Sequence, residues 1–128
     1  MPGPDVLSIA TREIEARIAQ KAGDQARAAS LFAEAASVQD RLPYMEPPYW
    51  YYPVRQSLGA ALLQAGKLAE AEEQFRLALK KTPNNGWTHF GLVELHKARG
   101  GGDAMRQAEA DLAKTWIGDR GLLKLSNL

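Results

Sequence analysis

An internal repeat constrains the fold of this chain more than any other feature. A small–aromatic–small trio, with a glycine five residues ahead of it, occurs twice at an interval of 43 residues. Its members are Gly23, Ala28, Phe32 and Ala35 in the first copy and Gly66, Ala71, Phe75 and Ala78 in the second. Gly100 lies 34 residues after Gly66, and Leu92 lies the same distance after Leu58. Periods of this size are typical of stacked helical units, which favours binding over catalysis because such units use their distinctive residues to pack on one another.

Helical periodicity and glycine, proline and asparagine punctuation predict six helices paired into three antiparallel hairpins. No alternating strand pattern of useful length occurs, so the expected class is all-α. We expect one domain over 1–128, with hairpins at about 6–40, 52–82 and 86–117, an insert at 43–51 and a C-terminal tail at 118–128. Asp5, Asp24 and Asp103 are the expected N-caps of the first, second and sixth helices.

Composition excludes several classes of function. Sixteen basic and fifteen acidic residues leave a net charge of +1 with no long block of either sign, which argues against nucleic acid as a partner. The absence of cysteine excludes disulfides and thiolate sites. No apolar run has the roughly 20 residues needed to span a bilayer, and the first residues do not resemble a signal peptide. We therefore expect a cytoplasmic protein that does not bind membranes.

The middle unit resembles the tetratricopeptide repeat in both residue type and spacing. The matching positions are Leu58, Gly59, Leu62, Gly66, Ala71, Phe75, Ala78 and Pro83. The first unit keeps Ala16, Gly23, Ala28, Phe32 and Ala35 but has Glu15 in place of a leucine. The third keeps Leu92, Gly100 and Leu112 at an uninterrupted 34-residue spacing, with Val93, Met105 and Glu109 at three consensus positions. A competing register aligns Trp87, Phe90 and Gly91 with the consensus Trp, Leu and Gly.

The resemblance implies a right-handed superhelix whose concave face, lined by the first helix of each hairpin, holds a peptide or a protein surface. One subgroup of similar proteins clamps the C-terminal carboxylate of chaperone tails with Lys and Asn. The corresponding positions here are Glu13, Arg17, Gln56 and Ala60, which argues against that ligand. The sequence also resembles the C-terminal segment of bacterial repeat proteins, a resemblance that implies no defined activity.

The first repeat interval is 43 residues long and the second is 34, so the first contains nine additional residues. These nine residues occupy positions 43–51, a segment rich in proline and aromatic residues. Tyr49, Trp50 and the adjacent Tyr52 are candidate partner contacts, since aromatic side chains supply large contact area at low entropic cost. The alternative is that the insert covers the seam between the first and second hairpins.

A second group of candidate contacts lies on the expected concave face. In the 34-residue register, Trp87 and Phe90 project towards a groove next to Gln56; in the other register they are core residues, and the tail leucines could also cover them. Arg17 and Lys21, with Arg55, can form a basic rim for an acidic partner, although scattered surface charges are usually only solvated.

Catalytic chemistry has little support in the sequence. His89 and His96 are seven residues apart on one helix, about 10 Å along its axis, so they cannot share a metal ion unaided. The glycine run at 100–102 lacks the preceding strand and the following Lys-Ser or Lys-Thr of a phosphate loop. We expect no catalytic residue, cofactor or metal.

The sequence thus predicts a non-catalytic scaffold that binds a protein or peptide. Two alternatives remain open. The chain could be an assembly or homo-oligomerisation module, because it lacks a clear polar capping helix at its C-terminal end. It could also be the non-catalytic end of a larger enzyme or regulator.

Overall fold

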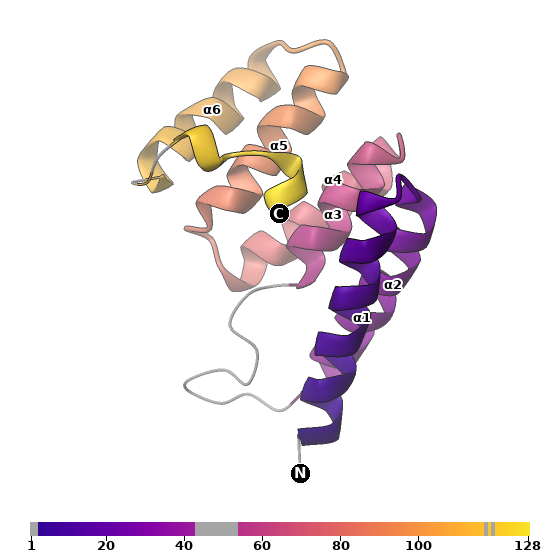
Figure 1. Cartoon of the computed structure of the whole chain (residues 1–128). Helices are drawn as coiled ribbons and strands as arrows, with labels where there is room; N and C mark the ends of the chain where they lie inside the picture. The colour runs from indigo at the N-terminus through magenta and orange to yellow at the C-terminus, as the bar shows by residue number, and fades with distance from the viewer. Residues whose placement is uncertain (1–2, 43–53, 117, 119) are drawn as a thin grey trace.

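The computed structural model describes residues 3–42, 54–116, 118 and 120–128, and these ranges consist of helices joined by short turns, with no strand among them. Two short 3-10 helices follow six α-helices (Figure 1). The α-helices are α1 (Gly3–Lys21), α2 (Gln25–Arg41), α3 (Val54–Gln64), α4 (Leu68–Lys81), α5 (Gly86–Ala98) and α6 (Asp103–Thr115), and the 3-10 helices are η1 (Arg120–Leu122) and η2 (Leu125–Asn127). The predicted all-α class is confirmed.

Glycine turns of one kind close the three hairpins. Gly23 and Gly66 both have φ +82°, and Gly100 has φ +105°, in the left-handed region that favours glycine. In each turn the residue after the glycine donates its backbone N–H to the carbonyl five residues back: Asp24 to Ala19 at 2.9 Å, Lys67 to Leu62 at 2.9 Å and Gly101 to His96 at 2.8 Å. These bonds satisfy carbonyls that the end of a helix would otherwise leave without partners.

The hairpins stack in chain order. Within each hairpin the two helices contact each other: α1 with α2, α3 with α4 and α5 with α6. Between hairpins, α2 contacts α3, and α5 contacts both α3 and α4. The first helices of the second and third hairpins therefore lie against each other, as a helical repeat requires. The helices of the third hairpin end 34 residues after those of the second: α3 ends at Gln64 and α5 at Ala98, while α4 ends at Lys81 and α6 at Thr115.

Phe75 fixes the distance between the second and third hairpins. Its ring is fully buried and lies against Gly59 of α3 and Gly91 of α5. A Cβ atom at Gly59 or at Gly91 would come within 2.6 Å of the ring. Both glycines are therefore required by close packing rather than by an unusual backbone angle.

The structure confirms one predicted N-cap and corrects two. The Asp24 side chain accepts from the Arg27 N–H at 3.0 Å, as expected of the cap of α2. Asp103 is instead the first residue of α6, after Gly102, and its carboxylate pairs with Arg106. Asp5 lies in the first turn of α1, because that helix already begins at Gly3. An acidic residue in the first turn of a helix still stabilises its N-terminus through the helix dipole.

The C-terminal tail returns to the middle of the stack. In Figure 1 the yellow segment passes from the end of α6 across α5 and ends beside α3, and η2 contacts α3. An ion pair between Arg120 and Glu109 at 3.7 Å links the start of the tail to α6. Leu128 is only 1% exposed and belongs to the hydrophobic core.

Candidate binding face

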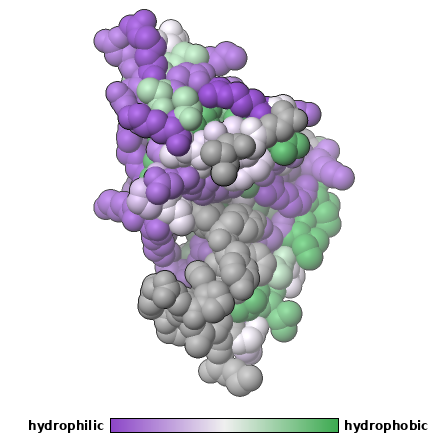
Figure 2. All heavy atoms as spheres, turned by 90° about the vertical axis from the view of Figure 1, so that its left-hand side faces the viewer, coloured by the Kyte–Doolittle hydropathy of each residue, from purple (hydrophilic) through white to green (hydrophobic). Residues whose placement is uncertain are grey.

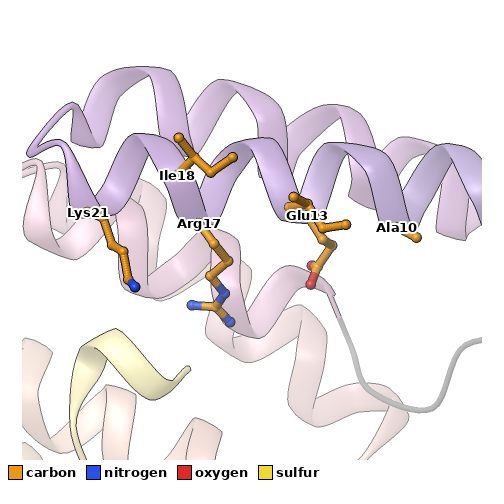
Figure 3. Close-up of a pocket in the computed structure, with 6 residues that line it drawn as sticks. Ala10, Glu13, Arg17, Ile18 and Lys21 are labelled. Carbon is orange, nitrogen blue, oxygen red and sulfur yellow. The ribbon is translucent and has the colours of Figure 1, made fainter.

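A shallow hollow of about 480 Å³ lies along α1, on the side that faces the tail. The residues that line it are Ala10, Glu13, Ile14, Arg17, Ile18 and Lys21. Figure 3 shows the Arg17 and Lys21 side chains extending from α1 towards the C-terminal segment. This helix-periodic set places the two predicted basic residues and Glu13 beside one another.

Arg17 is the most connected side chain of this face. Its Nη2 donates to the carbonyl oxygen of Leu128 at 2.9 Å and to Oγ of Ser57 at 3.2 Å. Its Nη1 donates to the carbonyl oxygen of Ser126 at 3.3 Å and to Oε1 of Gln20 at 3.1 Å. The guanidinium carbon also lies 5.3 Å from the centre of the Phe32 ring, a cation–π distance. One guanidinium thus connects α1, α2, α3 and the tail.

Two residues of α3 complete the contact with the end of the tail. Ser57 is fully buried, and its hydroxyl donates to the carbonyl oxygen of Leu128. Gln56 is 5% exposed, and its Nε2 lies 3.5 Å from the same oxygen. Gln56 in turn accepts a hydrogen bond from Nδ2 of Asn85 at 2.7 Å. Three donors therefore converge on one main-chain oxygen.

Glu13 gives this face an unusual electrostatic property. The residue is only 8% exposed, and its Oε1 has no hydrogen-bond partner among the described residues. Burial raises the pKa of the Glu13 carboxyl to about 7, while the positive charge of Arg17 acts in the opposite direction. Burial also lowers the pKa of Arg17, and the negative charge of Glu13 opposes that effect. The carboxyl therefore changes charge near neutral pH.

Trp87 and Phe90 both lie on α5 and are partly buried against the hydrophobic core. The Trp87 ring packs edge to face with Trp116, with centroids 4.8 Å apart and planes at 80°. Trp116 also covers the start of α5, where a Cβ atom at Gly86 would lie 2.8 Å from its ring.

The remaining predicted contacts lie apart from this network. Lys21 is exposed at the end of α1. Arg55, expected at the basic rim, instead bridges Asp40 of α2 and Gln74 of α4, at 2.6 Å to the latter. The insert at 43–51 and its aromatic candidates Tyr49, Trp50 and Tyr52 lie outside the described residues.

Sequence reasoning did not find Ser57, Asn85 or Leu128 as members of this face. A buried serine in a helix carries no sequence signal of its own. The tail offered one signal, the three-residue interval between Leu125 and Leu128, which is the repeat of a 3-10 helix.

Within the described ranges, no three His, Asp or Glu side chains lie close enough to form a metal site. His89 instead contacts the carbonyl oxygen of Pro83 through Nε2, at 2.9 Å. Among the same residues, no helix combines the length and the apolar composition needed to cross a membrane.

Comparison with known proteins identifies the repeat. The tetratricopeptide repeat family model matches residues 53–95, which include α3, α4 and most of α5. No curated protein and no solved structure matches the chain. The matched segment contains the Gly59, Phe75 and Gly91 contact that joins two hairpins. The segment at 53–95 is thus similar to the tetratricopeptide repeat, and the stack of helical hairpins agrees with that similarity.

Proposed function

We propose that this protein is a non-catalytic scaffold that binds a peptide or an extended protein segment on the face formed by α1, α3 and α5. Tetratricopeptide repeats are generally protein–protein interaction modules. The observation that carries the proposal is that a stretch of polypeptide already lies on this face, with the main-chain oxygen of Leu128 bonded to Arg17 and Ser57. A surface that donates hydrogen bonds to main-chain oxygens in this way suits a peptide ligand.

The composition of the face supports a ligand with both apolar and polar parts. Ala10, Ile14 and Ile18 supply apolar surface along the α1 hollow, while Arg17 and Lys21 supply positive charge. Mostly apolar pockets with a few placed polar groups are typical of binding sites. We include Gln56, Trp87 and Phe90 as contacts on the neighbouring hairpins, and Tyr49, Trp50 and Tyr52 as candidates from the insert.

Selection of binders from a random peptide library tests this proposal. Peptides selected on the wild-type chain should bind at least tenfold more weakly to an Arg17→Gln, Lys21→Gln double variant. Lys80→Gln is the matched control, because Lys80 lines a hollow on α4 instead. Failure to select any peptide, or equal binding by the double variant and the wild type, would contradict the proposed site.

A second candidate function, self-assembly, has its own supporting observation. Leu7, Ile14 and Ile18 on α1 are 69%, 63% and 63% exposed. Figure 2 shows hydrophobic side chains gathered along one edge of the molecule, apart from the hydrophilic upper part of the same face. A second copy that packs its own α1 against this stripe would bury it. Sedimentation of wild type and Ile14→Lys at two concentrations tests this, since assembly predicts a concentration-dependent mass that the variant loses.

A further inference from the structure

The end of the tail is anchored at one residue. Leu128 is 1% exposed, whereas Leu122 in the same tail is 53% exposed. The Leu128 side chain joins the hydrophobic core, and its backbone N–H donates to the carbonyl oxygen of Leu125 at 3.1 Å. The tail thus combines one buried apolar side chain with a local 3-10 turn. This turn places the main-chain oxygen of Leu128 against α1 and α3.

The protein recognises main-chain atoms around this anchor. The Leu128 oxygen accepts hydrogen bonds from Arg17 and Ser57 and lies at the limit of one from Gln56, and the Ser126 oxygen accepts a second bond from Arg17. Hydrogen bonds from a charged donor are roughly twice as strong as neutral ones. The contact therefore selects an apolar side chain and its backbone oxygens rather than a particular polar sequence.

The donors are held in place by groups other than the tail. The Phe32 ring and Gln20 support the Arg17 guanidinium, and Asn85 holds the amide of Gln56. Asn85 is itself fixed, because its side-chain oxygen caps α5. Donors oriented in advance lose less entropy on binding, which is the property of a formed receptor site. We call this set, Arg17, Gln56 and Ser57, the tail seat.

We propose that the tail seat is the site where the scaffold holds its partner and that residues 120–128 are an internal ligand that competes for it. The partner is then a peptide that places a leucine-like side chain in the Leu128 position and its backbone oxygens against Arg17 and Ser57. This inference rests on the proposed function and adds the ligand chemistry and the regulation of that site.

Covalent attachment gives the tail an advantage over any partner. A segment of the same chain that lies a short distance along the sequence from its site acts at an effective concentration of about 1 mM. If the free segment binds with a Kd of about 0.1 mM, the attached tail lowers the apparent affinity for an external peptide roughly tenfold. A partner must therefore bind more tightly than the tail or act when the tail is released.

The test uses the full chain and a fluorescent synthetic peptide of residues 120–128 as the probe. Leu128→Ser removes the apolar anchor while leaving the tail seat unchanged, so this variant should bind the peptide about tenfold more tightly than wild type does. Adding Arg17→Gln to Leu128→Ser should remove most of that binding. Leu122→Ser, which alters an exposed leucine of the same tail, should behave as wild type. Equal affinities for wild type and Leu128→Ser, or equal gains from both leucine variants, would overturn the proposal.

Hydrogen exchange keeps the inference falsifiable if Leu128→Ser folds poorly. In the wild-type chain, a large excess of a library-selected peptide should speed exchange of the Asn127 and Leu128 amides, while amides of α3 keep their protection. Unchanged tail exchange in the presence of a bound peptide would overturn internal competition and leave the proposed function intact. Absence of any selected peptide would contradict the proposed function itself.

Discussion

The side-chain amide of Asn85 donates a hydrogen bond to Oε1 of Gln56 at 2.7 Å, across the boundary between the second and third hairpins. The oxygen of the same amide accepts from the backbone N–H groups of Trp87 and Thr88 at 3.1 and 3.4 Å. Asn85 thus caps α5 and orients a side chain of α3 at the same time. Only an amide can fill both roles, because a carboxylate could cap the helix but could not donate to Gln56.

Replacing Asn85 should separate these two roles. We expect Asn85→Ala to lower the free energy of unfolding by about 1 to 2 kcal/mol, since it removes a cap and a hydrogen-bond partner. Asn85→Asp should keep the cap and lose only the bond to Gln56. Urea denaturation measures the stability of both variants. Asp24→Ala is the matched control, because Asp24 caps α2 but has, among the described residues, no bond equivalent to that between Asn85 and Gln56. A loss in Asn85→Asp as large as that in Asn85→Ala would show that the bond to Gln56 carries the effect.

Adding one methyl group beside Phe75 should destabilise the stack. Gly91→Ala would place a Cβ atom 2.6 Å from the buried ring. We expect it to cost about 1 to 3 kcal/mol, despite the better helix propensity of alanine. Thermal and urea unfolding provide the measurement.

Gly3→Ala is the control for that substitution, because a Cβ atom there meets nothing within 4 Å. Adding Phe75→Leu to Gly91→Ala should restore part of the lost stability by making room for the methyl group. A net gain from Gly91→Ala alone would mean that the hairpins separate easily at this point.

Glu13 should make stability depend on pH near neutrality. Its pKa is raised from 4.5 to about 7 in the folded chain. The folded state therefore holds this proton more tightly, and the resulting stability, complete below pH 4.5, is lost as the pH rises through 7. Glu13→Gln should be more stable than wild type at pH 8, by about 1 to 3 kcal/mol, and nearly equal to it at pH 4.

Chemical denaturation at a series of pH values measures this difference. Glu15→Gln, on the exposed side of the same helix, should show no comparable change between pH 4 and pH 8. A wild-type stability that is flat from pH 4.5 to 7 would contradict the buried environment of Glu13.

The Trp87–Trp116 pair should act mainly on the stability of the third hairpin. We expect Trp87→Ala to cost about 1 to 3 kcal/mol, because it removes a partly buried ring and an aromatic pair. Near-UV circular dichroism in a Trp50→Phe background would report the loss of the pair. Phe90→Ala is the comparison, since the described residues give Phe90 no ring partner. A spectrum unchanged by Trp87→Ala would show that the two rings do not pack in solution.

The repeat could be predicted because its signal is local and recurs. Gly23, Gly66 and Gly100 mark turns that form the same bond, and Phe75 lies between small residues whose spacing the sequence displays. The tail seat could not be predicted in the same way. The contact from Arg17 to Leu128 joins residues 111 positions apart, and periodicity gives no measure of such a distance. The sequence suggested that tail leucines could cover Trp87 and Phe90, but nothing in it indicated Ser57 as a partner of the tail.

The ring of Phe75, held between Gly59 and Gly91, also has a geometric consequence. Because both backbones rest directly on it, the thickness of one side chain sets how far the second hairpin is offset from the third. A thinner or wider residue there would alter the tilt between successive units and so the curvature of the whole array. The relative placement of these two hairpins is therefore adjustable at a single interior position.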